Sequence, residues 1–69
     1  MTKSQLSSLR RFDGEWRTLA VLRHRGVDGA DMLAMIKLGF VEVRSCGEEF
    51  YRISADGWRE LRKQRAAGG

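Results

Sequence analysis

Few side chains in this sequence could catalyse a reaction or hold a metal ion. It has one histidine, His24, and one cysteine, Cys46, which are far apart in the chain and lack the spacing of zinc ligands. No nucleophile–base pair and no glycine-rich phosphate loop is present. The adjacent residues Glu48 and Glu49 do not place two carboxylates across a substrate. We therefore expect no enzymatic activity, no metal site and no cofactor.

The basic residues are the other chemically informative group. The chain of 69 residues carries 13 Lys and Arg against 9 Asp and Glu, a net charge of +4. Residues 1–25 and 59–69 hold most of the basic charge, whereas residues 26–58 are acidic overall. Basic segments favour nucleic-acid binding, because Lys and Arg that contact phosphates release condensed counterions. A solvated, non-binding face is the open alternative.

Hydrophobic spacing predicts two helices in the first part of the chain. The stretch "SQLSSLRRF" places apolar residues at helical intervals, with Ser4 as a candidate N-cap. The stretch "DGEWRTLAVLRHRG" repeats the pattern, with Asp13 as a candidate cap and Gly26 at its end. The Asp13-Gly14 dipeptide either separates these two helices or only distorts one long helix locally.

A third helix is predicted within "VDGADMLAMIKLG". Asp28 is its expected N-cap, and Gly39 is its expected left-handed terminator. Apolar side chains cover most of its circumference, and Lys37 is its only basic residue. We expect Leu33 and Ile36 to face the core of the protein, which would leave Met32 and Met35 at the surface.

The segments that follow predict a hairpin and a last helix. Val41 and Val43 alternate with charged residues, as do Tyr51 and Ile53, and this period of two indicates strands on either side of "SCGEE". Ser54 is the expected N-cap of the C-terminal helix, in which residues 66–69 should be frayed. The predicted core comprises Trp16, Leu19, Leu22, Leu33, Ile36, Phe40, Val43, Tyr51, Ile53, Trp58 and Leu61.

The stretch "LGFVEVR…EEFYRISADGWREL" resembles the end of a winged-helix domain of the bacterial regulator type. In that family a helix runs into a glycine, a strand, a tight wing, a second strand and a helix that opens "T-x-x-G". The corresponding pieces here are Gly39, residues 40–44, residues 45–49, residues 50–53, and Ser54 with Gly57. The resemblance implies a single α+β domain over residues 1–69, mostly helical, with a two-stranded wing.

The resemblance also implies a function, the binding of double-stranded DNA by a small regulator of transcription. In such domains a recognition helix enters the major groove and the wing touches the DNA backbone. Between Gly26 and Phe40 there is room for only one helix. Either the second helix or the recognition helix has been lost, or "DGEWRTLAVLRHRG" is the first helix of the helix-turn-helix pair and "SQLSSLRRF" is the opening helix. The candidate DNA-binding residues are Arg10, Arg11, Arg17, Arg23, Arg25, Lys37, Arg44 and Arg52.

Two features depart from the winged-helix pattern. The helix in the recognition position is largely apolar, and the wing tip carries Glu48 and Glu49, which would face phosphates. These departures favour a second hypothesis, in which the helix of residues 29–38 binds a second copy of the chain or a partner protein. Met32 and Met35 are the candidate interface residues, because flexible thioethers suit adaptable contacts.

The sequence also suggests where the protein works. No apolar run approaches the roughly 18 residues of a membrane span, and the N-terminal stretch lacks the apolar core of a signal peptide. A single cysteine excludes an internal disulfide. We expect a cytoplasmic protein that does not associate with membranes.

Overall fold

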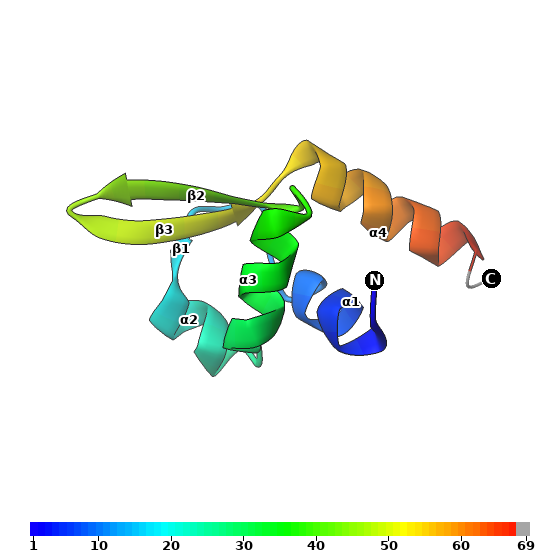
Figure 1. Cartoon of the computed structure of the whole chain (residues 1–69), viewed down its shortest axis with the longest axis horizontal. Coiled ribbons are helices and arrows are strands. Elements are labelled where there is room, and N and C mark those ends of the chain that lie inside the picture. Colours follow the sequence, from blue (N-terminus) through cyan, green and yellow to red (C-terminus); the bar gives the residue numbers. More distant parts are fainter. Residues whose placement is uncertain (68–69) are drawn as a thin grey trace.

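The protein has an α+β fold in which about half of the residues are helical. The computed structural model describes residues 1–67 (Figure 1). The elements are α1 (Lys3–Leu9), β1 (Arg17–Thr18), α2 (Leu19–His24), α3 (Gly29–Lys37), β2 (Val41–Cys46), β3 (Glu48–Ile53) and α4 (Ala55–Ala67). Fraying was expected at residues 66–69; α4 extends to Ala67, and residues 68 and 69 lie outside the described residues.

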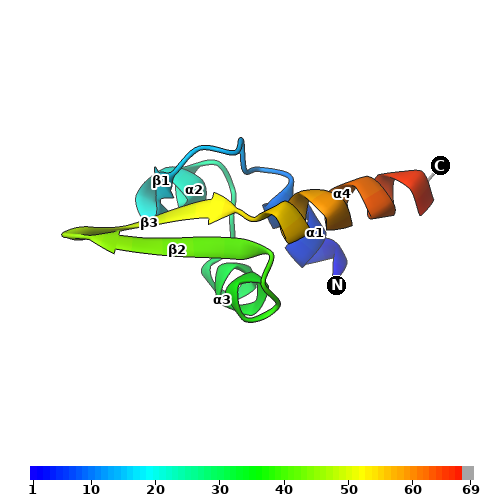
Figure 2. The same cartoon turned by 90° about the horizontal axis from the view of Figure 1, so that it is seen from above.

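The three strands form one antiparallel sheet in the order β1-β3-β2. In the hairpin Val41 lies opposite Ile53 and Val43 lies opposite Tyr51, so the predicted pairing is confirmed. The turn is at Gly47, whose φ of 77° lies in the left-handed region that glycine enters without strain. The half of the hairpin nearest this turn projects beyond the helices (Figures 1 and 2).

Strand β1 and helix α2 replace the helix predicted from residue 13 onward. Arg17 and Thr18 pair with Tyr51 and Phe50 of β3, so the chain is extended where a helix was expected. The N-cap of α2 is Thr18, whose side chain accepts a hydrogen bond from the backbone N–H of Val21, and the prediction of Asp13 as the cap is wrong. Two residues of strand give too short a pattern to be recognised without their partner strand.

The start of α1 differs from the prediction by two residues, and its buried face is tied to α3. Thr2 is the N-cap and forms a reciprocal capping box with Gln5, whereas Ser4 lies inside the helix. Ser4 and the buried Ser8 both donate hydrogen bonds to the carboxylate of Asp31. The Ser8 hydroxyl also accepts a bond from the backbone N–H of Asp28, so α1 is fixed to the first turn of α3.

Helix α3 begins and ends where the sequence indicates but buries a neighbouring face instead of the predicted one. Asp28 caps it by accepting bonds from two backbone N–H groups, and Gly39 follows it with a φ of 82°. Met32 and Met35 are buried, Ile36 is partly buried and Leu33 is 65% exposed, so the predicted orientation is wrong for Leu33, Met32 and Met35. Both faces of this helix are apolar, and its own sequence therefore cannot determine which one faces α1 and the sheet.

The junction between the hairpin and α4 is tightly built. The Ser54 hydroxyl accepts a bond from the Gly57 N–H at 3.0 Å, as an N-cap does, and donates one to the carbonyl of Gly39 at 2.6 Å. A Cβ at Gly57 would lie 2.4 Å from the carbonyl oxygen of Phe40. Only glycine allows the first turn of α4 to approach the backbone before β2 this closely.

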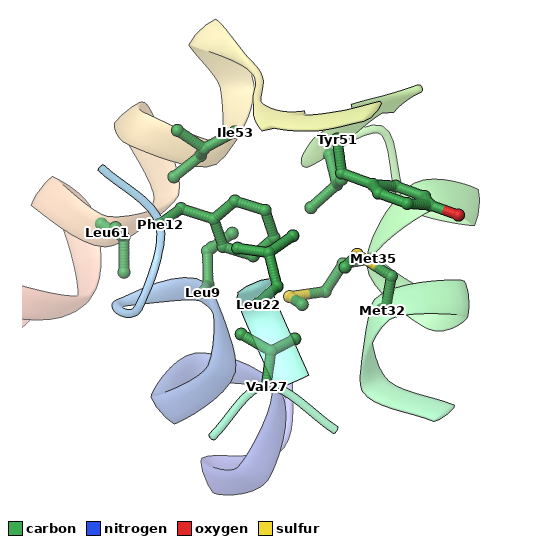
Figure 3. Packing of buried hydrophobic residues seen from close by; sticks show 10 residues of the cluster. Leu9, Phe12, Leu22, Val27, Met32, Met35, Tyr51, Ile53 and Leu61 are labelled. Carbon is green, nitrogen blue, oxygen red and sulfur yellow. The ribbon is translucent and has the colours of Figure 1, made fainter. Parts of the chain in front are cut away.

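The core gathers side chains from every helix and from both strands of the hairpin (Figure 3). The predictions of Leu22, Tyr51, Ile53 and Leu61 as core residues are confirmed. Leu19, Ile36 and Phe40 are partly buried against this core, and Trp16 is half-buried. Besides Leu33, Val43 (42% exposed) and Trp58 (41% exposed) were wrongly predicted as core. The buried hydrophobic residues are Leu9, Phe12, Leu22, Val27, Met32, Met35, Val41, Tyr51, Ile53 and Leu61.

Candidate nucleic-acid interface

The exposed face of α3 offers little that could read a DNA base. Its solvent-facing residues are small or apolar apart from Lys37, and Leu38 immediately after the helix is 53% exposed. Base edges are read by side chains such as Arg, Asn, Gln and Ser. Asp31, the other charged residue within the helix, is already bonded by Ser4 and Ser8. The face can therefore contact an apolar surface or a single phosphate, but not a base sequence.

Basic side chains gather instead around Asp13, between α1 and β1. Arg17 donates to Asp13 Oδ2 through Nη2 at 2.8 Å and through Nε at 3.2 Å. Arg25, at the end of α2, donates to the same oxygen at 3.1 Å. The guanidinium of Arg11 lies beside Gly26, where its Nε would be 3.9 Å from an added Cβ. We call Arg11, Asp13, Arg17 and Arg25 the arginine cluster.

The arginine cluster keeps a net positive charge with spare hydrogen-bond donors. Hydrogen bonds from the Arg17 side chain, the Glu15 backbone N–H and the Arg25 side chain hold the pKa of Asp13 well below its usual range. The hydrogen bond and charge of Asp13 in turn raise the pKa of Arg17. One carboxylate thus serves two guanidinium groups, and each guanidinium has donors left over for another anion.

A second basic group lies on the outer face of the sheet. Arg52 is stacked over the ring of Trp16, with 4.4 Å between the guanidinium carbon and the ring centroid, and Arg44 approaches the same ring at 5.9 Å. Arg52 also forms an ion pair with Glu42 at 3.0 Å. Next to it is a surface hollow of about 280 Å³, lined by Trp16, Arg44, Cys46 and Phe50. Both arginines here are held by an aromatic ring.

The tip of the hairpin is acidic and carries one side-chain hydrogen bond. Glu48 and Glu49 are both exposed, and Glu49 Oε2 accepts a hydrogen bond from the Tyr51 hydroxyl at 2.6 Å. This bond, followed by burial and by the charge of Glu49, raises the pKa of Tyr51. The bond also gives Glu49 a structural role, which the sequence did not reveal.

Helix α4 presents a basic face that the list of candidate residues omitted. Ala55, Trp58, Arg59 and Arg62 line a shallow surface hollow, and Arg59 pairs with Asp56 at 2.9 Å. The basic run after residue 58 was visible in the sequence. The exposure of Trp58 could not be predicted, because its position one turn after Ser54 indicates a hydrophobic staple with Ile53.

The structure thus brings together some of the eight basic candidates and separates others. Arg11, Arg17 and Arg25 are in the arginine cluster, and Arg44 and Arg52 share the ring of Trp16 on the outer sheet face. Arg10, Arg23 and Lys37 are exposed and form no ion pair within residues 1–67. The two interface candidates, Met32 and Met35, lie in the core, where they cannot reach a partner without unfolding α3.

Within the described part of the chain, no three His, Cys, Asp or Glu side chains are grouped so that they could hold a metal ion. Over the same residues no helix has the length and apolar character needed to cross a membrane. Comparison with models of protein families, with curated proteins and with solved structures finds no match for this chain.

Proposed function

We propose that this protein is a winged-helix-type domain that binds duplex DNA, and that it does so through phosphate contacts made by arginines of its first half. The order of elements supports the first part of the proposal. Three helices precede the hairpin and one follows it. This is the order that the resemblance requires, with α1 as the opening helix, α2 and α3 as the helix-turn-helix pair, and β2–β3 as the wing.

The observation that carries the DNA-binding part is the arginine cluster. Two guanidinium groups, those of Arg17 and Arg25, bind one carboxylate at a place where the α1–β1 loop meets the end of α2, and Arg11 lies beside the adjacent Gly26. Arg10 and Arg23 are exposed nearby in sequence and add positive charge without acidic partners among the described residues. Phosphate binding requires Lys or Arg side chains whose charge is not neutralised, and these arginines supply that charge.

The same geometry favours backbone contacts over base recognition. The exposed face of α3 lacks side chains that form paired hydrogen bonds with bases, and the wing tip is acidic. A protein of this kind binds many DNA sequences with similar affinity, and its binding weakens steeply with salt. We therefore expect modest sequence preference.

The test is duplex binding measured against salt concentration, using the double variant Arg11→Glu, Arg23→Glu. Neither residue forms an ion pair in the described part of the chain, so the fold should be retained. The wild-type protein should show a log–log salt slope of several units, and the variant should lose at least about tenfold in affinity at low salt, because phosphate contacts dominate.

The matched control is Arg62→Glu, Lys63→Glu on α4, which changes the net charge by the same amount on another element. It should bind DNA nearly as well as the wild-type protein. Equal loss in both variants would show that only total charge matters, which contradicts an interface at the arginine cluster. No binding by the wild-type protein at low salt would contradict DNA binding altogether.

A specific observation favours one second candidate, a protein-interaction module that uses α3. Leu33 and Leu38 are 65% and 53% exposed on the same side of the molecule as Ala30 and Ala34, and exposed leucines grouped in this way are typical of interaction surfaces. This surface replaces the one first predicted from Met32 and Met35.

The two candidates respond to different substitutions. Leu33→Glu should leave the circular dichroism spectrum and the thermal midpoint nearly unchanged, because the side chain is solvent-exposed. If α3 is the functional surface, this variant loses partner binding and keeps DNA binding. Loss of DNA binding in Leu33→Glu, with the fold intact, would instead place α3 at the DNA.

A further inference from the structure

Strand β2 is an open edge of the sheet. Its inner side pairs with β3 along all six residues, and β1 lies at the opposite edge. Over residues 1–67, none of the backbone hydrogen bonds outside the regular elements involves residues 41–46. Figures 1 and 2 show that the tip half of the hairpin extends past α3, so that no helix runs along this stretch. An open edge is a template for pairing with another strand.

The register of the hairpin identifies which backbone groups face this open edge. The Ser54 N–H donates to the Phe40 carbonyl, so the backbone groups of Phe40 point toward β3. Direction alternates along an antiparallel strand. The backbone groups of Val41, Val43 and Ser45 therefore point outward, and Val43 is the middle residue of the three.

The side chains of β2 are self-complementary about the same residue. If two copies pair antiparallel with Val43 opposite Val43, then Glu42 lies opposite the partner's Arg44, and Arg44 lies opposite the partner's Glu42. Arg44 has no acidic partner within the described residues, whereas Arg52 on the neighbouring strand has Glu42. Opposite charges in directly facing positions stabilise strand pairing, and like charges destabilise it.

The same register would also bury the Val43 side chain, which is exposed to solvent in the monomer. Val43 is 42% exposed although it lies on the face of the sheet that is buried at its base. Moving the centre of the pair by one residue would place Arg44 opposite the partner's Arg44 or Glu42 opposite the partner's Glu42. The charges therefore favour the register centred on Val43 over these two alternatives.

We propose that two copies of this chain associate through β2, in an antiparallel pair centred on Val43 with reciprocal Glu42–Arg44 contacts. This interaction goes beyond DNA binding and uses a surface separate from the arginine cluster and from the exposed face of α3. A contact of five residues on each side is small, so the dimer is weak and depends on protein concentration. Its strand pairing is that of β-augmentation.

Charge reversal tests the pairing by sedimentation velocity of the full chain. Arg44→Glu places glutamates opposite each other, and Glu42→Arg places arginines opposite each other. Each variant should self-associate on the order of tenfold more weakly than the wild-type protein, since two facing pairs become repulsive. A mixture of the two variants should form a heterodimer, because each then presents the opposite charge to the other.

Cysteine cross-linking tests the register. In a Cys46→Ser background, Val43→Cys should form an intermolecular disulfide under mild oxidation, because directly facing Cα atoms are about 5.5 Å apart. Ser45→Cys in the same background should not, because the two cysteines would be offset by four residues, or about 14 Å. The native Cys46 would be offset by about 20 Å and should not cross-link either.

Three results would overturn the proposal. The first is a wild-type protein that stays monomeric up to high concentration. The second is a mixture of the two charge variants that associates no better than either variant alone. The third is cross-linking at Ser45→Cys that equals cross-linking at Val43→Cys. DNA binding by the arginine cluster is unaffected by any of these results, so the two proposals fail separately.

Discussion

The base and the tip of the hairpin have the same sequence pattern and different physical roles. At the base, Val41 and Ile53 face each other and are both buried, and Ser54 and Gly57 lock the strand end against α4. Farther toward the tip, Val43 continues the same alternation but is 42% exposed, although Tyr51 opposite it is buried. The helices cover the base and end before the tip (Figure 2).

This difference shows that alternation defines a face but not its burial. A period of two places alternate side chains on the same face of the sheet. How much of that face is buried depends on the length and placement of the covering helices. The base therefore supplies stability to the fold, and the tip is available for contacts with other molecules.

Among these substitutions, Ile53→Ala at the base of the hairpin should cause the largest loss in the free energy of unfolding. The side chain is 2% exposed and belongs to the core, so truncation leaves a cavity and should cost about 2–5 kcal/mol in the free energy of unfolding. Chemical denaturation measures this cost. A loss below about 1 kcal/mol would show that the base is loosely packed and would remove the contrast with the tip.

Gly57→Ala should have the next largest effect. The new methyl group would lie 2.4 Å from the Phe40 carbonyl oxygen and 2.6 Å from Ile53 Cγ1, so the first turn of α4 must move away from β2. We expect a loss of about 1–3 kcal/mol, as in other overpacked sites. The control is Gly29→Ala in the first turn of α3, where an added Cβ meets no atom within 4 Å. If both variants are equally stable, the contact at Gly57 is not tight.

Val43→Ala should have the smallest effect on the monomer. Because the side chain is already 42% exposed, the loss in the free energy of unfolding should stay below about 1 kcal/mol. The measurement is denaturation at low protein concentration, where self-association through β2 is negligible. A loss as large as that of Ile53→Ala would mean that tip and base form one continuous core.

The residues that could be predicted from the sequence are those that act on their immediate neighbours. Asp28 and Ser54 as N-caps, Gly39 after α3, and the pairing of Val41 with Ile53 are correct. Each depends on a backbone requirement within a few residues or on the strand period. The basic residues of the candidate site were recognisable for the same reason, since charge is a property of the residue itself.

The grouping of those residues could not be predicted. The arginine cluster depends on Asp13, which the sequence favoured as a helix cap and which instead bonds Arg17 and Arg25. Arg17 and Arg25, which are 4 and 12 positions from Asp13, meet at its carboxylate because the chain is extended after α1 and returns through α2. No local signal encodes this return.

Local signals predict the order of the elements from α3 onward, the N-caps of α3 and α4 and the cross-strand partners in the hairpin, because capping groups, glycines and alternating side chains act locally. The strand ends at the turn differ from the prediction, since β2 continues to Cys46 and β3 begins at Glu48 where a loop over residues 45–49 was expected. The burial of Met35, the exposure of Leu33 and the position of Arg17 in a strand depend instead on how the elements pack together. A helix that is apolar on all sides has no preferred face until its neighbours are placed. A strand of two residues is likewise stable only when a longer strand, here β3, lies beside it.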